Sequence, residues 1–316
     1  MVEQFSLQNM TTQQKIHMGQ DASKDYLIPE GGVDWGKVSA LHNTYSYPGQ
    51  AGVYISSTSL RARDVTINGY VSYVLSDTER MSISPQHWVE YAYSKILQKK
   101  HLLDSVLNPQ DRVRIIVGSY YLEGKPNSSV VFGKTSEENN AYFCKFQISL
   151  YCAYPMFKKI SQTVATLNGT TPSFHFPLVF PRGEGIIMSI RKNYQLIAIT
   201  NDGAIPTGCV IRMKSSGEVV NPRIENVFTG EHIAINKTLS SGEELVINTN
   251  DGEEKGIFGM LNGVEENYFK YWTLDSSWMK IPVGTSLIGY SVESENESLL
   301  DVTVEISPAR YSLEEL

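Results

Sequence analysis

The chain has only three cysteines among its 316 residues, and their placement argues against a disulfide. Cys144 and Cys152 fall in one expected strand, where their separation is ~26 Å. A disulfide requires Cα atoms within about 7 Å of each other. We therefore expect reduced, buried thiols, as in a protein made in a cytoplasm.

Long apolar runs and excess positive charge are also missing. No stretch reaches the ~18 apolar residues that a membrane-spanning helix requires. The opening MVEQFSLQNM has neither the basic start nor the apolar centre of a secretory signal. The formal net charge is −7, which disfavours binding to nucleic-acid phosphates as the main activity. With 41% hydrophobic residues, the composition is that of a soluble globular protein.

Motifs for catalysis or metal binding are absent as well. The six histidines never occur at i and i+4 or beside a cysteine pair, and no GxSxG motif is present. Gly133, Lys134 and Thr135 match the end of a phosphate loop, but Ser128 stands where its first glycine is required. Glu253 and Glu254 fit a solvated turn. We expect no enzyme, no cofactor and no metal site.

What is present is a long β pattern in the middle of the chain. Between Ala141 and Pro155 the larger apolar side chains fall on every second position, which predicts one long strand with an apolar face. Pro155 lacks a backbone donor and ends the strand. After Pro155 the pattern changes to many short strands separated by turn residues, so we predict two domains, residues 1–160 and 161–316.

The first domain is expected to be a β-sandwich-type domain with one α-helix and a projecting hairpin. Ser84 is the expected cap of a helix from Gln86 to about Leu103, whose buried side carries Val89, Ala92, Tyr93, Ile96 and Leu103. Strands are expected at 61–74 and 112–122. The turn at 124–127 and the polar residues 127–140 predict the hairpin. Residues 1–60 show no sustained hydrophobic period, and we interpret them as an extended arm.

The second domain is expected to be an antiparallel β-sandwich. Short apolar strands alternate with turn signals such as Asn250-Asp251-Gly252 every eight to twelve residues. Its aromatic residues leave two interpretations open. In the first, which we favour, Tyr268, Trp272 and Trp278 pack in the core or in a subunit contact. In the second, they form an exposed surface for a glycan or a partner.

In sequence order, several segments resemble the distal tail proteins of long-tailed bacteriophages and related phage-tail-like particles. The segment Arg63–Gly69 is similar to a strand near the start of the family's ring domain, and 151–157 resembles its domain-closing strand. The family often has an acidic residue in place of Ala153 or Tyr154. The resemblance continues through a series of turn and strand residues in the second half: Asn201-Asp202-Gly203, Pro206-Thr207-Gly208, Asn221-Pro222, Thr229-Gly230-Glu231, Gly242–Leu245 and Tyr290-Ser291.

The resemblance implies a structural protein of the virion tail tip, made in the cytoplasm of the bacterial host. In this family, the N-terminal domain forms a homo-hexameric ring and the C-terminal domain is a galectin-like antiparallel sandwich. The ring joins the tail tube protein to the tail-tip hub or tail-associated lysin protein. It carries receptor-binding or baseplate proteins, DNA passes through its lumen, and no membrane is involved. The lumen surface is then expected to be acidic or neutral.

Two further expectations concern surfaces. The subunit interface is placed on the 123–140 hairpin, the N-terminal arm and one face of the helix, with Gly124, Lys125, Asn127, Lys134, Glu137 and Glu138 as its candidates. The rival function is a carbohydrate-binding sandwich that serves host adhesion directly. It would be favoured if the rings of Tyr268, Trp272 and Trp278 were exposed. A hydrolase with dispersed catalytic residues is a third and weaker reading.

Overall fold

A computed structural model describes residues 4–20, 26–167, 169–172, 189–192, 196–293 and 299–313. The chain divides into two compact units, Met1–Ile160 with Tyr311–Leu316, and Ser161–Arg310. Both are mainly β, as predicted. No helix in the described ranges has the length and apolar character needed to cross a membrane.

The first unit is built on a closed sheet of seven strands. Their order is β11-β7-β3-β2-β1-β8-β9, and β9 pairs back with β11 through Leu150 opposite Pro126. The predicted sandwich-type architecture is therefore wrong, because one sheet closes on itself in place of two sheets that stack. The strands are β1 (Phe5–Asn9), β2 (Lys15–Gly19), β3 (Tyr26–Leu27), β7 (Arg63–Ser72), β8 (Val113–Val117), β9 (Tyr120–Pro126) and β11 (Phe143–Cys152). Two short strands flank them, β4 (Val33–Asp34) on β7 and β12 (Phe157–Lys159) on β9.

The long strand predicted from the alternation is β11, and it pairs with β7 along its full length. Its side chains at alternate positions, from Cys144 to Cys152, are buried inside the barrel. Gly69 of β7 allows the close approach expected there, because a Cβ at this position would lie 2.6 Å from Phe146. The strand thus forms one wall of the core.

Residues 1–60 contribute more to the barrel than the sequence indicated. Phe5 and Leu7 of β1 and Ile16 and Met18 of β2 are buried in its core. Tyr26 of β3 is also buried, and its hydroxyl donates to the Lys99 carbonyl at 2.9 Å. The description of this segment as an extended arm is therefore wrong for its first half.

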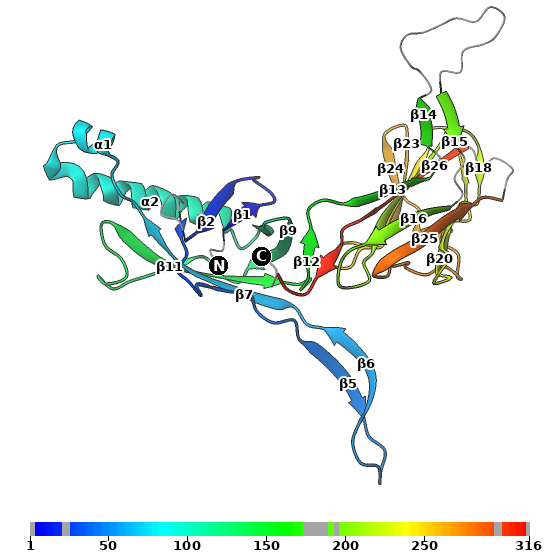
Figure 1. Cartoon of the computed structure of the whole chain (residues 1–316), viewed down its shortest axis with the longest axis horizontal. Coiled ribbons are helices and arrows are strands. Elements are labelled where there is room, and N and C mark those ends of the chain that lie inside the picture. The colour runs from blue at the N-terminus through cyan, green and yellow to red at the C-terminus, as the bar shows by residue number, and fades with distance from the viewer. Residues whose placement is uncertain are drawn as a thin grey trace, which may run out of the picture. The chain divides into compact units, whose positions relative to one another are not determined.

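One long helix covers the barrel. After α1 (Asp77–Ser82) and the 3-10 turn η1 (Pro85–His87), α2 (Trp88–Val106) contacts β7, β1 and β2 (Figure 1). Ala92, Ile96 and Leu103 are buried as predicted. Val89 and Tyr93 are exposed, so their predicted burial is wrong.

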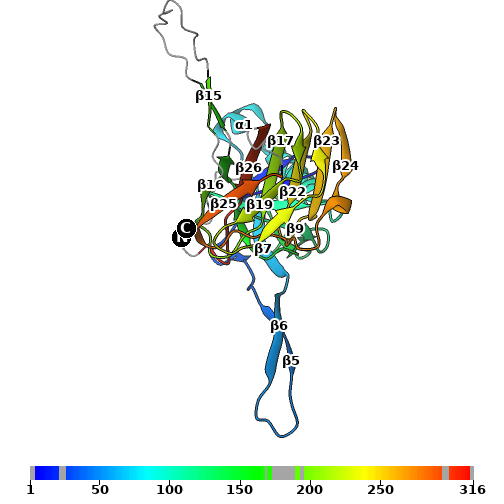
Figure 2. The same cartoon turned by 90° about the vertical axis from the view of Figure 1, so that its right-hand side faces the viewer.

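The projecting hairpin lies elsewhere than predicted. It consists of β5 (Ala40–Tyr45) and β6 (Tyr54–Leu60) and extends away from the barrel in both views (Figures 1 and 2). In the predicted segment, β10 (Val131–Phe132) instead lies along β11, and Phe132 packs against the core. Residues 127–133 therefore continue the barrel wall.

The second unit contains two antiparallel sheets that share one core. One has the order β13-β26-β17-β22-β23-β24 and the other β16-β25-β19-β20 (Figures 1 and 2). This agrees with the expected sandwich. The strands of the two sheets are β13 (Thr163–Leu167), β16 (Leu196–Asn201), β17 (Cys209–Ser215), β19 (Arg223–Asn226), β20 (His232–Ala234), β22 (Glu244–Asn248), β23 (Gly256–Leu261), β24 (Val264–Asn267), β25 (Gly284–Ser291) and β26 (Leu300–Ile306). The remaining elements of this unit are β14 (Gly169–Pro172), β15 (Ser189–Lys192), β18 (Val219–Val220), β21 (Thr238–Leu239), β27 (Ala309–Arg310) and the 3-10 turn η2 (Phe269–Tyr271).

Candidate interaction surfaces

The hairpin β5–β6 is the most exposed part of the first unit. Every residue of its two strands is exposed. Three tyrosines pack near its tip, with the Tyr45 ring centroid 5.3 Å from Tyr47 and 5.1 Å from Tyr54. Val53 and Ile55 lie beside them with more than half of their surface exposed. These side chains place an apolar surface at the end of an otherwise polar ribbon.

The hairpin is also uncharged. From Val38 to Leu60 the sequence contains no Asp, Glu, Lys or Arg, although 19% of the whole chain is charged. A two-stranded hairpin alone in water is marginally stable. Charged residues are a common means of keeping such an edge from pairing with other chains. Their absence and the exposed tyrosines indicate a surface that another chain covers.

The helix α2 presents a second exposed apolar surface. Val89, Tyr93 and Leu97, the helix stripe, are 51%, 44% and 37% exposed. They recur every fourth residue and therefore lie on one face of the helix. At the N-terminal side, Glu79 of α1 accepts hydrogen bonds from the hydroxyls of Tyr73 at 2.5 Å and Tyr91 at 3.1 Å. These bonds hold the pKa of Glu79 at about 2 and fix α1 against α2.

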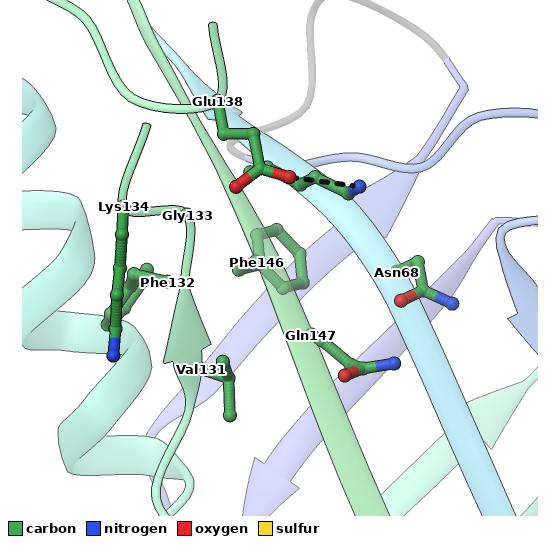
Figure 3. A pocket seen from close by; sticks show the side chains of 9 residues that line it. Asn68, Val131, Phe132, Gly133, Lys134, Glu138, Phe146 and Gln147 are labelled. Carbon is green, nitrogen blue, oxygen red and sulfur yellow. Dashed lines mark ion pairs between the residues drawn. The ribbon is translucent and has the colours of Figure 1, made fainter. Parts of the chain in front are cut away.

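A shallow hollow of about 320 Å³ lies on the barrel beside β10 (Figure 3). Figure 3 shows Lys134 on one side of it and the amides of Asn68 and Gln147 on the other. Glu138 closes one end and forms an ion pair with Lys145 at 3.5 Å. The hollow can therefore receive a polar side chain from a partner, but its geometry defines no reaction.

The six candidate interface residues fall into two groups. Lys134 and Glu138 line the hollow, and Glu137 is exposed beside them. Lys125 is exposed on β9, which runs along β11, and Asn127 is exposed directly after the end of that strand. Gly124 is buried, and a Cβ there would lie 2.8 Å from the Cys152 sulfur, so this glycine serves the packing of the barrel wall.

In the second unit, the predicted aromatic surface separates into buried and partly exposed rings. Tyr268 is buried and packs in the core. Trp272 and Trp278 lie 4.7 Å apart and are partly buried against the same core. Phe269 is stacked on both and is about half exposed. We call these three partly accessible rings, Phe269, Trp272 and Trp278, the aromatic cluster.

Tyr268 belongs to a buried polar network that the sequence did not reveal. Its hydroxyl donates to Glu243 Oε1 at 2.8 Å, and Lys237 Nζ donates to the same oxygen at 2.6 Å. The Ser240 amide donates to the other oxygen at 2.9 Å. Burial alone would raise the pKa of Glu243, but these hydrogen bonds outweigh it and hold the pKa below its usual value. The network fixes the turn before β22.

The groups that could carry chemistry are few in the described part of the chain. No cluster of three His, Cys, Asp or Glu side chains suited to a metal ion occurs there. Cys144, Cys152 and Cys209 are buried and free. Burial raises the pKa of Cys152 to about 12 and that of Cys209 to about 11, so both are thiols at neutral pH.

Comparison with known proteins gives these surfaces a context. Residues 202–305 match the family described as "Siphovirus-type tail component, C-terminal domain". The Dit protein (gp 19.1) of phage SPP1 has a similar fold, with a TM-score of 0.58 and 13% identity over 95% of this chain and 98% of that chain. A chain of the phage P2 baseplate in its activated conformation aligns at a TM-score of 0.46 and 9% identity, over 96% and 98%. No curated protein sequence matches the chain.

Residues 202–305 therefore carry a domain of the siphovirus-type tail component class, and the chain shares the fold of the SPP1 protein. Within that class, the resemblance to the distal tail proteins drawn from the sequence is confirmed.

Proposed function

We propose that this chain is a non-enzymatic structural protein that forms a homo-hexameric ring at the distal end of a phage tail. The ring joins the tail tube protein to the tail-tip hub and carries peripheral adhesion proteins. The SPP1 protein of similar fold is described as a paradigm of a hub adsorption apparatus in phages that infect Gram-positive bacteria. That description, together with the family match, supports the proposal.

The observation that carries it is the hairpin β5–β6. A ribbon with every strand residue exposed and no charge between Val38 and Leu60 is poorly suited to an isolated subunit in water. Contacts with neighbouring copies bury its tyrosines and stabilise its strands. A chain that carries such an element on one side and a different apolar surface on another is suited to a closed ring.

The uncharged hairpin also fits a channel for DNA. Lysine or arginine in the lumen would hold the phosphates and slow the passage of DNA. Hydroxyl and amide side chains such as Ser57, Thr58 and Asn43 offer no such attraction. We propose that any part of the hairpin that lines the lumen presents this neutral surface.

Mass photometry and negative-stain electron microscopy of the full chain at high concentration test the ring. We expect six-fold rings with a central hole. A double variant, Tyr54→Asp with Ile55→Asp, places two charges on the hairpin surface and should reduce the particles to monomers. Both side chains are exposed in the monomer, so its fold should persist.

Val264→Asp is the matched control, because Val264 is an exposed apolar strand residue of the second unit. It should leave the rings unchanged. Rings that survive the double hairpin variant would assign assembly to another surface. A wild-type chain that remains monomeric even in the presence of the tail tube protein would overturn the ring itself.

A carbohydrate-binding adhesion role is the alternative function, and the geometry supports it less. Tyr268 is buried, and Trp272 and Trp278 pack against the core of the sandwich. Only Phe269 of the aromatic cluster is exposed as far as a stacking surface requires. A glycan-binding screen of the full chain tests this alternative directly.

A further inference from the structure

The helix stripe is an apolar surface that does not contribute to the core of the first unit. A helix that covers a sheet requires one apolar face, and α2 already has it in the buried Ala92, Ile96, Leu103 and Val106. Val89, Tyr93 and Leu97 form another stripe, which follows the flank of the helix toward solvent. A contiguous exposed stripe of this kind is characteristic of an interaction surface.

We propose that the helix stripe receives the β5–β6 hairpin of a neighbouring copy in the ring. This inference rests on the proposed function and adds to it the two surfaces that meet. The occupant is a second copy of this chain, because the chain itself carries an exposed surface of the matching kind.

The hairpin cannot reach the stripe of its own subunit. It joins the N-terminal end of β7 at Arg63, whereas α1 and α2 follow the C-terminal end of β7 at Ser72 (Figure 1). The ten residues of β7 span ~33 Å. The contact must therefore form between copies, head to tail. Such a heterologous contact closes into a ring when the rotation between subunits divides a full turn.

The exposed side chains of the two surfaces match in number and kind. The hairpin has seven large side chains that are 41–65% exposed, namely Leu41, Tyr45, Tyr47, Val53, Tyr54, Ile55 and Leu60. Leu41, Tyr45 and Tyr54 share one face of its two strands, and this face can lie on the three side chains of the helix stripe.

The charges of the two surfaces are compatible. Burying an unpaired charge is strongly unfavourable, and the hairpin brings none into the contact. Tyr93 adds a hydroxyl that the Ser, Thr and Asn side chains of the hairpin can bond. The charged Glu90 and Lys95 of α2 can remain at the rim in water.

Disulfide trapping between copies tests the contact. The three native cysteines are buried, so engineered surface cysteines react without interference. Full-length Tyr54→Cys and Tyr93→Cys proteins are mixed, assembled and oxidised, and covalent dimers are measured on a non-reducing gel. We expect the mixed pair to cross-link at least about tenfold faster than either variant alone.

Gln98→Cys in place of Tyr93→Cys is the matched control, because Gln98 is exposed on the same helix but turned about 140° from Tyr93. Mass photometry of the same samples reports ring assembly independently. Rings without the specific cross-link, or with equal cross-linking at Gln98, overturn the stripe as the receiving surface and leave the ring proposal intact. Rings that cross-link only through other tail proteins added to the mixture assign the stripe to those proteins. Absence of rings even in the presence of the tail tube protein overturns both proposals.

Discussion

The buried carboxylate of Glu243 gives the sharpest stability prediction for the second unit. Its side chain is 1% exposed and accepts hydrogen bonds from Lys237, Tyr268 and the Ser240 amide. Glu243→Gln keeps the size but turns an NH₂ group toward one of these donors. Removing one partner of a buried ion pair typically costs about 3–5 kcal/mol. Because Lys237 keeps some contact with water, we expect a loss of about 3 kcal/mol in the free energy of unfolding.

The measurement is urea unfolding of the full chain in a Trp35→Phe and Trp88→Phe background, so that the fluorescence of Trp272 and Trp278 reports the second unit. Glu266→Gln is the control, since Glu266 pairs with Lys270 at 2.7 Å where both side chains are more than half exposed. An exposed pair of this kind contributes less than about 1 kcal/mol. Equal losses for the two variants would refute the reasoning, because burial would then make no difference.

The same network predicts a pH dependence. The pKa of Glu243 is lowered in the folded state, so the unfolded chain takes up a proton first as the pH falls. The stabilisation is complete above the unfolded pKa of about 4.3 and is lost as the pH falls through the folded value. The difference between the wild type and Glu243→Gln should therefore shrink below about pH 4. A difference that is constant from pH 7 to pH 3 would exclude the carboxylate as its source.

Two further substitutions test the packing of the same region. Gly259→Ala should destabilise the second unit by about 2–3 kcal/mol, because its Cβ would lie 1.8 Å from the buried Tyr268 ring. Met260→Ala, on the exposed side of the same strand, should cost less than about 1 kcal/mol in the same urea assay. Trp272→Ala should cost about 2 kcal/mol and leave retention on glycan columns unchanged, with Phe269→Ala as the milder control; a selective loss of glycan retention would instead support the adhesion function.

The sequence predicted the elements whose pattern is long and one-sided. The strand β11 was identified because its alternation continues over ten residues and Pro155 follows. Most strands of the second unit were identified by the turns between them. The first two strands, by contrast, were missed because each supplies only two apolar inward positions, Phe5 and Leu7 in β1 and Ile16 and Met18 in β2. β1 is placed by its pairing with β8, which lies about a hundred residues further along the chain, and β2 is placed by its pairing with β1.

The closure of the barrel could not be predicted for a related reason. It depends on two residue pairs between β9 and β11, and no local pattern encodes whether a sheet closes or stacks on another. The helix shows the same limit. Its periodicity gave apolar positions on two faces, but only the tertiary contacts distinguish Ala92 in the core from Tyr93 on the surface.

The β5–β6 hairpin was not predicted as the projecting element because the patterns used for prediction assume a core within the same chain. In β5–β6, Leu41 and Tyr45 lie on one face and Ile55 and Leu60 on the other, so neither face reads as the inner one. The polar 127–140 segment was predicted to project, but its residues Val131 and Phe132 pair with β11. The informative signal was the missing charge between Val38 and Leu60. A segment that lacks charged side chains for a solvated surface, and also lacks a single apolar face for its own core, is suited to burial between copies. This criterion could have identified the hairpin from the sequence.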